Sequence, residues 1–245
     1  MKKVIIGISA TILIFAIFIS CDKVETVKFR SYVTTYYDWN SILLKDTEEG
    51  DILIYGSGGS FYCGWKSQGS EKDKYDNLCR LHNDMSYHTK RRFIAFPDWG
   101  EHYKNDITKI DIVSNADFDS EHKAGTSLSD IVRFLSVSPI KFIESGYKQT
   151  YDWDNNYPDN FKASSAINYV SVSNIEDQKC YHPIDKIVSE LSSSDLILLG
   201  NGWVGNFGIL VFDKQPDLEK EHELTVTVSV SNNRVFMPKI IKVFE

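Results

Sequence analysis

The sequence predicts a mainly β protein: an antiparallel β-sandwich of immunoglobulin-like form with two short helices. Aromatic residues make up 13% of its 245 residues. Gly, Asn, Asp and Ser interrupt the chain often, as they do in β-rich domains. The run 224–230 alternates strictly between apolar and polar residues, which is typical of a half-buried strand. An α+β fold is the alternative, because the order strand, loop, short helix is expected twice.

Residues 1–20 are predicted to be a lipoprotein signal peptide. Two lysines precede an apolar run of 16 residues, and Ser20 then stands before Cys21. A 16-residue helix is about 24 Å long, shorter than the ~30 Å hydrocarbon core, so a permanent transmembrane anchor is the weaker interpretation. Phe18 occupies a position where such signals most often have Leu. Cys21 is therefore expected to be lipidated, with an ordinary signal peptide or an uncleaved anchor as alternatives.

The rest of the chain divides into a tether and a body. Residues 21–28 carry mixed charge and are expected to be a short tether, and 29–245 to be a β-rich extracytoplasmic domain with a sub-boundary considered near 100–106. Lipid on Cys21 would place the protein in the cell envelope, at the outer membrane, on either its periplasmic or its surface face. Without residues 1–20 the chain has 25 basic and 34 acidic residues, a net charge of −9. This charge argues against nucleic acid as a partner and against tight adsorption to anionic lipid.

Apolar periodicity and turn residues predict the strands. We expect strands at 27–37, 51–55, 92–96, 107–113, 140–144, 167–172, 196–199, 208–212, 224–230, 235–236 and 240–244. The glycine-rich stretch 56–60 lacks the lysine and the helix of a phosphate-binding loop, so it is predicted to be a turn. Asn232 and Asn233 can take the left-handed backbone angles of a tight turn, and Pro238 limits its strand to an edge or a bulge.

Two helices are expected at about 127–136 and 183–192. Their apolar residues recur at i, i+3, i+4 and i+7: Leu128, Ile131, Val132 and Leu135, then Ile184, Ile187, Val188 and Leu191. Pro183 would occupy the first helical position of the second. A diverged duplication would explain the repeated order, and so would chance. Residues 66–77 are predicted to be a surface loop. The helical spacing of Tyr75, Leu78, Cys79, His82 and Met85 predicts a short, polar helix over 75–85.

The stretch from Ile107 to Asp119, the Ala-Gly-Thr-Ser-Leu turn at 124–128 and the strand at 224–228 carry a family resemblance. Over roughly residues 90–245 the chain resembles a group of uncharacterised Bacteroidetes lipoproteins. The resemblance implies an envelope location and a β-rich fold. That family has no established activity, so the resemblance transfers no catalytic residue to this chain.

Three cysteines remain after Cys21: Cys63, Cys79 and Cys180. In an oxidising compartment one pair can form, and a Cys63–Cys79 disulfide would close a short polar loop. Three separate, partly buried thiols are the alternative. Cys63-Gly64-Trp65 lacks the order of a papain-type nucleophile motif, and no histidine is spaced as its base. No catalytic residue is assigned.

Two acidic clusters are candidate calcium ligands: Asp117, Asp119 and Glu121, and Asp152, Asp154 and Asn156. An EF-hand is rejected because His122 and Tyr157 stand where its loop requires glycine. The alternative to irregular calcium ligation is a pair of solvated turns whose carboxylates bond nearby backbone. No metal and no cofactor is predicted.

Aromatic residues in the loops are the candidate ligand contacts: Trp99, Trp153, Trp203, Tyr151 and Tyr157. An aromatic face beside carboxylates and amides can stack on a sugar and bond its hydroxyls. Large aromatic side chains also pin long loops to a β-sandwich by burying apolar area. Both interpretations remain open at this point.

The leading functional prediction is a lipid-anchored envelope protein without enzymatic activity. It would bind or assemble with an envelope component, or take an extracellular protein or glycan as ligand. The alternative is an envelope hydrolase acting on glycan or peptide. A hydrolase should have a deep cleft in which a cysteine or carboxylate meets a histidine, whereas a binding module should have a shallow groove or an exposed aromatic platform.

Overall fold

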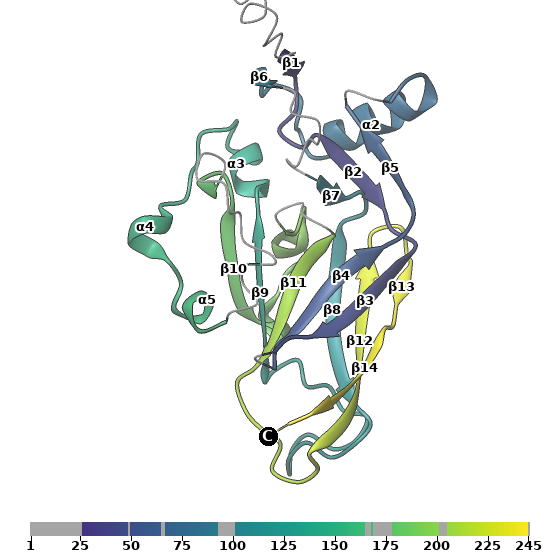
Figure 1. Cartoon of the computed structure of the whole chain (residues 1–245), viewed down its shortest axis with the longest axis vertical. Coiled ribbons are helices and arrows are strands. Elements are labelled where there is room, and N and C mark those ends of the chain that lie inside the picture. Colours follow the sequence, from purple (N-terminus) through teal and green to yellow (C-terminus); the bar gives the residue numbers. More distant parts are fainter. Residues whose placement is uncertain are drawn as a thin grey trace, which may run out of the picture.

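The computed structural model describes residues 26–48, 50–64, 67–92, 101–164, 168, 178–200 and 205–244, and within them the protein is mainly β (Figure 1). The predicted fold class is confirmed at this level: antiparallel sheets pack face to face as a sandwich. All core residues that the structure describes lie between Phe29 and Phe244, so the body contains its own core.

The central layer is a five-stranded antiparallel sheet. In spatial order its strands are β10 (His182–Ile187), β9 (Val132–Ser138), β11 (Asn206–Phe212), β4 (Ile52–Ser57) and β3 (Ser41–Asp46). Successive side chains of a strand point to opposite faces, and here both faces are buried. Ile52 and Ile54 pack in one core, while Leu53 between them packs in the other.

A four-stranded sheet covers one face of this layer. Its centre is β12 (Glu221–Val230), which pairs with β8 (Ile107–Ser114) on one side and with β13 (Val235–Phe236) and β14 (Lys239–Val243) on the other. The even-numbered residues of β12 from Leu224 to Val230 are buried in the shared core, as the alternation predicts. Asn233 has the expected positive φ, 64°, in the turn before β13.

Helices and smaller sheets cover the opposite face. β5 (Ser60–Cys63), β2 (Thr35–Asp38) and β7 (Glu101–Tyr103) form one sheet, in which β2 and β7 are parallel. β1 (Thr26–Phe29) pairs with β6 (Thr89–Arg92). The helices are α2 (Ser70–Leu81), α3 (Ile140–Glu144), α4 (Trp153–Asn156) and α5 (Asp159–Ala163), with 3-10 turns η2 (Val188–Glu190) and η3 (Ser193–Leu196). The predicted turn at 56–60 joins β4 to β5 and requires glycine at Gly59, where φ is 101°.

Both helices predicted from apolar spacing are wrong. Residues 132–138 are β9, and 182–187 are β10 followed by the η2 turn. The two segments pair with each other, with Ile184 opposite Ser136. β9 is buried on both faces, so its apolar residues fit a helical period by coincidence. Pro183 belongs to an edge strand, where proline removes no ladder bond that the sheet needs.

Other predicted boundaries also change. The expected strand at 140–144 is helix α3, and 196–199 contains the end of η3 rather than a strand. Most of the predicted loop at 66–77 belongs to α2, which confirms the helical spacing that follows it. The expected strand 27–37 is two strands, β1 and β2, and since β1 begins at Thr26 the tether ends earlier than 28.

Three further expectations concern the segments 92–96, 167–172 and 100–106. The expected strands at 92–96 and 167–172 lie almost wholly outside the described residues. The region 100–106 does not divide two domains, because Trp39 and Ile52 before it share a core with Ile110 and Phe134 after it.

Candidate functional site

A pocket of about 400 Å³ opens between the N-terminal segment of the body and helix α2. Residues 28–31 line one wall, and side chains of α2 from Lys72 to Arg80 line the other, with Gly64 and Met85 completing the lining. We call it the basic pocket. Figure 1 shows β1, β6 and α2 together at the end of the molecule opposite the C-terminus. The basic pocket therefore lies at the end where the chain enters the body.

Local sequence explains why α2 forms this wall. Glu71 and Asp73 occupy its first turn and Arg80 its last, which matches the charge preferences of a helix dipole. Tyr75 and Cys79, four residues apart, share one face and are buried. That face packs against β2 and β5, so the polar face of α2 is left for the pocket and the solvent.

The opposite wall is fixed by one buried carboxylate. Asp84 accepts hydrogen bonds from the backbone N–H groups of Tyr32 (2.6 Å) and Val33 (2.8 Å) and from the hydroxyl of Tyr147 (2.9 Å). Asp84 is fully buried, and that burial raises its carboxyl pKa although the three donors oppose the shift. Because Asp84 follows the end of α2 directly, these bonds hold residues 31–33 against the helix and so place Arg30 and Ser31 at the pocket.

The pocket floor is polar, buried and internally bonded. The Tyr75 hydroxyl donates to the Val33 carbonyl (2.7 Å) and lies 2.5 Å from Ser31 Oγ. A phenol has one proton, so Ser31 is the donor of the second bond. Burial raises the pKa of the neighbouring Cys79 thiol to about 11. Since the thiolate is the nucleophilic form, Cys79 is unreactive at neutral pH.

The pocket rim is positively charged, although the chain as a whole has a net negative charge. It carries one acidic side chain, Asp76, and four cations: Lys28, Arg30, Lys72 and Arg80. Lys72 pairs with Asp76 on the same helix. Lys28 and Arg30 form no ion pair within the described parts of the chain. A chain of net charge −7 thus concentrates uncompensated positive charge at one concave site, which favours an anionic ligand.

Histidine–carboxylate pairs occur elsewhere in the structure. His82 Nε2 lies 2.9 Å from Asp106 Oδ1, and the His82 side chain is almost fully buried. His122 lies between Asp119 and Asp130. Neither histidine lines the basic pocket. The arrangement expected of a hydrolase, a histidine meeting a cysteine or carboxylate in a cleft, is therefore not the arrangement of this pocket.

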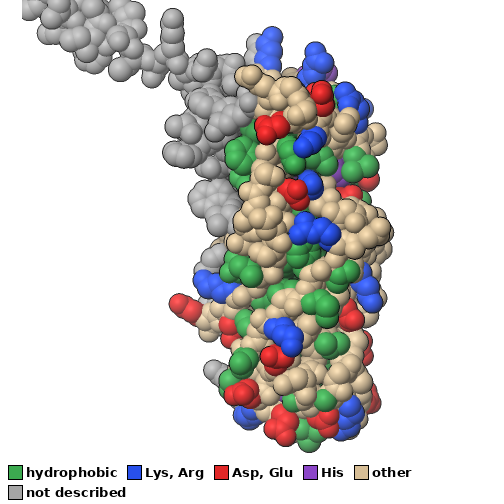
Figure 2. Space-filling view, turned by 90° about the vertical axis from the view of Figure 1, so that its right-hand side faces the viewer, with side chains coloured by type: hydrophobic (Ala, Val, Ile, Leu, Met, Phe, Trp, Pro, Cys, Tyr) green, Lys and Arg blue, Asp and Glu red, His purple; other side chains and the backbone are tan. Residues whose placement is uncertain are grey.

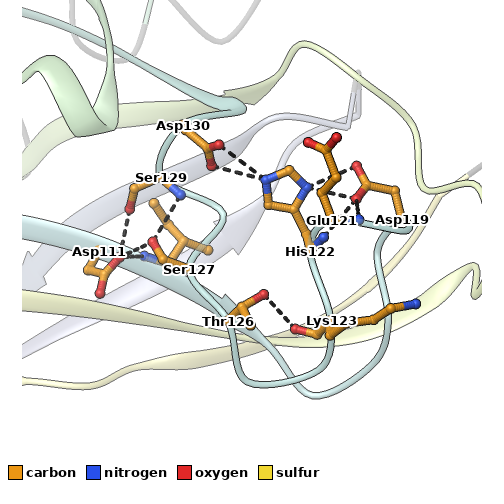
Figure 3. A network of polar contacts seen from close by, with 10 residues as sticks. Asp111, Asp119, Glu121, His122, Lys123, Thr126, Ser127, Ser129 and Asp130 are labelled. Carbon is orange, nitrogen blue, oxygen red and sulfur yellow. Dashed lines mark hydrogen bonds and ion pairs between the residues drawn. The ribbon is translucent and has the colours of Figure 1, made fainter.

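The loop around His122 explains the first acidic cluster (Figure 3). His122 Nδ1 is 2.8 Å from Asp119, and Nε2 is 3.1 Å from Asp130. Asp119 also accepts the backbone N–H groups of Glu121 and His122, each at 2.8 Å. These backbone bonds and the imidazole lower the Asp119 pKa to about 2. Burial alone would lower the His122 pKa, but the two carboxylates outweigh it and raise that pKa.

The carboxylates considered as calcium ligands are used to shape their own loops. Asp117 accepts the N–H of Ala124 (2.9 Å) and pairs with Lys123. In the second cluster Asp152 accepts the N–H of Asn155 and caps α4. Among the described residues, no group of three or more His, Cys, Asp or Glu side chains is arranged to hold a metal ion.

Trp153 pins its loop to the body. It is buried, and its indole N–H points at the carbonyls of Gln178 (2.9 Å) and Tyr181 (3.1 Å). The ring of Tyr151 contacts it edge-on at 4.9 Å between centroids, and Tyr157 packs at 5.7 Å. Its faces are thus occupied by the protein's own aromatic side chains. An exposed sugar-stacking platform centred on Trp153 is therefore wrong.

Three predicted site residues, Cys21, Trp99 and Trp203, lie outside the described residues. The cysteines of the body are described: Cys63, Cys79 and Cys180 are buried free thiols, so the predicted Cys63–Cys79 disulfide is not present. In place of a bond to Cys63, the Cys79 thiol has hydrogen bonds with the Tyr75 and Ser31 hydroxyls at the pocket floor.

A second pocket, of about 490 Å³, lies toward the end of the molecule that carries the C-terminus. We call it the acidic pocket, because Asp46, Glu48 and Asp51 line it with one cation, Lys242. Three of its four charges are bonded within the protein: Lys242 is buried and its Nζ is 3.0 Å from Asp46, and Asp51 accepts the Ser164 hydroxyl at 2.5 Å.

Comparisons with known proteins do not assign this chain to a family. No protein-family model, curated protein or solved structure matches this chain. The resemblance to Bacteroidetes lipoproteins therefore stays a prediction. No helix in the described ranges combines the length and the apolar character needed to cross a membrane.

Sequence reasoning missed the basic pocket, because its cations are far apart along the chain. Lys28 belongs to the expected tether at 21–28, and Lys72 to the expected loop at 66–77. The available signal was the charge order of α2, acidic in its first turn and basic in its last, with Tyr75 and Cys79 four residues apart. No signal in the sequence brings residues 28–31 to that helix, since Asp84 joins them across more than 50 residues.

Proposed function

We propose that this protein is a non-enzymatic binding module of the cell envelope, tethered through lipid on Cys21, and that the basic pocket is its ligand site. The ligand would be a molecule with an anionic group. The single observation that carries this proposal is the excess of four cations over one carboxylate at the rim, above a floor whose thiol is buried. The rim supplies attraction, and the floor supplies no nucleophile.

Two further observations support binding rather than catalysis. The nearest thiol, Cys79, is fully buried with a raised pKa. The donors of Ser31 and Tyr75 are already committed to internal acceptors. Iodoacetamide should consequently leave Cys79 unmodified in the folded protein at pH 8 and modify it in urea. Rapid modification of Cys79 without denaturant would contradict this account.

The tether is tested by removing the lipidation site. The Cys21→Ser variant, expressed in a bacterium that processes lipoproteins, should lose labelling by a radioactive fatty acid. Its processed form should leave the membrane fraction when the membranes are washed in about 0.5 M salt, which screens charge contacts at the surface. Unchanged labelling and fractionation would overturn the anchor, and they would leave the pocket to be judged by binding alone.

The pocket is tested by calorimetric titration of the protein, solubilised in a neutral detergent, with inorganic phosphate and with glucuronate. At least one anion should bind, and the Arg30→Gln/Arg80→Gln variant should bind it at least tenfold more weakly. Lys109→Gln, which removes an exposed charge from β8, serves as the control and should bind normally. Absence of binding by both anions, or equal losses in the two variants, would overturn the proposal.

A further inference from the structure

We propose that the basic pocket takes the phosphate headgroup of a lipid in the same membrane that holds the Cys21 anchor. This inference rests on the proposed function, because it names the ligand class of the same pocket. It gives the protein two attachments to one bilayer, one covalent and one reversible. Five features of the chain, taken in turn, lead to it.

The first feature is reach. Lys28 is seven residues from Cys21 in the sequence, and seven extended residues span at most about 25 Å. A lipid on Cys21 lies in the bilayer, so the pocket cannot be farther than this from the headgroup layer. The acidic pocket belongs to the opposite end of the molecule, where Phe244 and the C-terminus lie (Figure 1).

The second feature is charge. In Figure 2 the upper end, which carries α2, displays Lys and Arg side chains with fewer Asp and Glu, whereas the lower end mixes Asp and Glu with Lys and Arg. Anionic lipid attracts basic residues near its surface and repels acidic ones. The net negative chain would therefore approach an anionic bilayer with its α2 end foremost.

The third feature is the chemistry of the rim. Arg30 and Arg80 can each present two parallel N–H groups to the oxygens of a phosphate, and lysine adds a compact charge. The floor hydroxyls of Ser31 and Tyr75 already donate inside the protein. The headgroup would thus be held by the rim cations, at the mouth of the pocket.

The fourth feature is an apolar flank beside these cations. Leu81 follows Arg80 at the end of α2 and is 64% exposed, and Met85 lines the pocket. A basic side chain next to an exposed apolar one suits the boundary between headgroups and acyl chains.

The fifth feature is the confinement of positive charge to this site. A chain of net charge −7 does not adsorb to anionic lipid as a whole. A concave rim with four cations and one carboxylate can do so locally and in one orientation. The net charge predicts that anionic lipid repels the body. This prediction then holds for every part of the body except the anchored end.

Vesicle sedimentation tests the proposal without the covalent anchor. The protein is the chain from residue 21 onward with Cys21→Ser, which keeps the whole described body and its cores. The probes are phosphatidylcholine vesicles with and without 30% phosphatidylglycerol, in about 0.15 M salt. Binding should require phosphatidylglycerol and should weaken strongly in about 0.5 M salt, since surface charges are then screened.

The variants separate the pocket from general charge. Arg30→Gln and Arg80→Gln should each weaken vesicle binding about fivefold, the loss expected for one basic residue near an anionic surface. The matched control Lys109→Gln removes the same charge from an exposed position on β8 and should bind like the parent. Leu81→Ser should weaken binding without changing its salt dependence.

The outcomes are distinguishable. Binding of at least one soluble anion together with vesicle binding that depends on Arg30 and Arg80 supports both proposals. Binding of inorganic phosphate or glucuronate without vesicle binding overturns the lipid headgroup and leaves the proposed function intact. Binding of neither a soluble anion nor vesicles overturns both. Vesicle binding that falls equally in Lys109→Gln also overturns the headgroup site, because the charge of the whole surface would then account for it.

Discussion

The basic and acidic pockets have similar volumes, about 400 and 490 Å³, but they use their charges differently. In the acidic pocket the cation Lys242 is buried and bonded to Asp46. In the basic pocket Lys28 and Arg30 are exposed and form no ion pair among the described residues. Charges bonded within the protein contribute to stability, whereas unpaired charges at a concave rim remain free to bind. The comparison therefore separates a structural pocket from a candidate site.

The largest expected effect is on the frame of the basic pocket. Asp84→Ala should lower the free energy of unfolding by about 3 kcal/mol, because it leaves the buried N–H groups of Tyr32 and Val33 without their acceptor. Urea denaturation followed by tryptophan fluorescence measures the loss. The control Asp159→Ala removes a carboxylate that is 94% exposed and should change stability little. A loss below about 1 kcal/mol for Asp84→Ala would show that residues 31–33 are held by other contacts.

The next effect tests the floor of the same pocket. A Cβ on Gly64 would lie 2.7 Å from the Tyr75 ring, although the Gly64 backbone is not left-handed. Gly64→Ala should therefore cost about 2 kcal/mol by displacing that ring, which is the usual range for overpacking. The cost should largely disappear when the same change is made in a Tyr75→Leu background. Equal costs in both backgrounds would place the strain elsewhere.

A paired substitution tests the comparison of the pockets directly. Lys242→Ala should destabilise the fold by about 2 kcal/mol, because the buried stem and its bond to Asp46 are both lost. Lys28→Ala, at an exposed position with no ion pair among the described residues, should change stability by less than about 0.5 kcal/mol. Chemical denaturation under identical conditions measures both. Similar losses would remove the distinction between internally bonded and free charges.

The smallest effect concerns His122, whose charge is bonded internally like that of Lys242. The pKa of His122 is raised in the folded protein. Its ion pairs with Asp119 and Asp130 therefore stabilise the fold fully below the unfolded-state pKa of about 6.5, and this stabilisation is lost as the pH rises through the folded-state pKa. Asp119, whose pKa is lowered to about 2, stays ionised until the solution is strongly acidic, so its part of the stabilisation is lost only there. His122→Asn should thus lower the free energy of unfolding, measured by urea denaturation, more at pH 5.5 than at pH 8.5, with a difference under about 1 kcal/mol. The exposed His88→Asn serves as the control, and a loss equal at both pH values would contradict the assignment.

Sequence reasoning succeeded where one face of a strand meets solvent. β12 alternates because its odd-numbered residues lie on the outer face of its sheet, and β8 was also found. It failed at β9, where Phe134 and Leu135 are both fully buried on opposite faces, so the period of two is hidden. The basic pocket could not be predicted, because its walls meet through long-range hydrogen bonds of Asp84 and Tyr75 to residues 31–33.

The position of β12 has a consequence for how this protein is made. β12 is the central strand of its sheet and pairs with β8, more than 100 residues earlier in the chain. It supplies four fully or nearly fully buried residues to the core between the two main sheets: Leu224, Val226, Val228 and Val230. That core cannot close until the last tenth of the chain has arrived, because contacts of such long sequence separation form late. A chain exported from its amino end would cross the membrane before it could fold, and its final shape would be reached only on the far side.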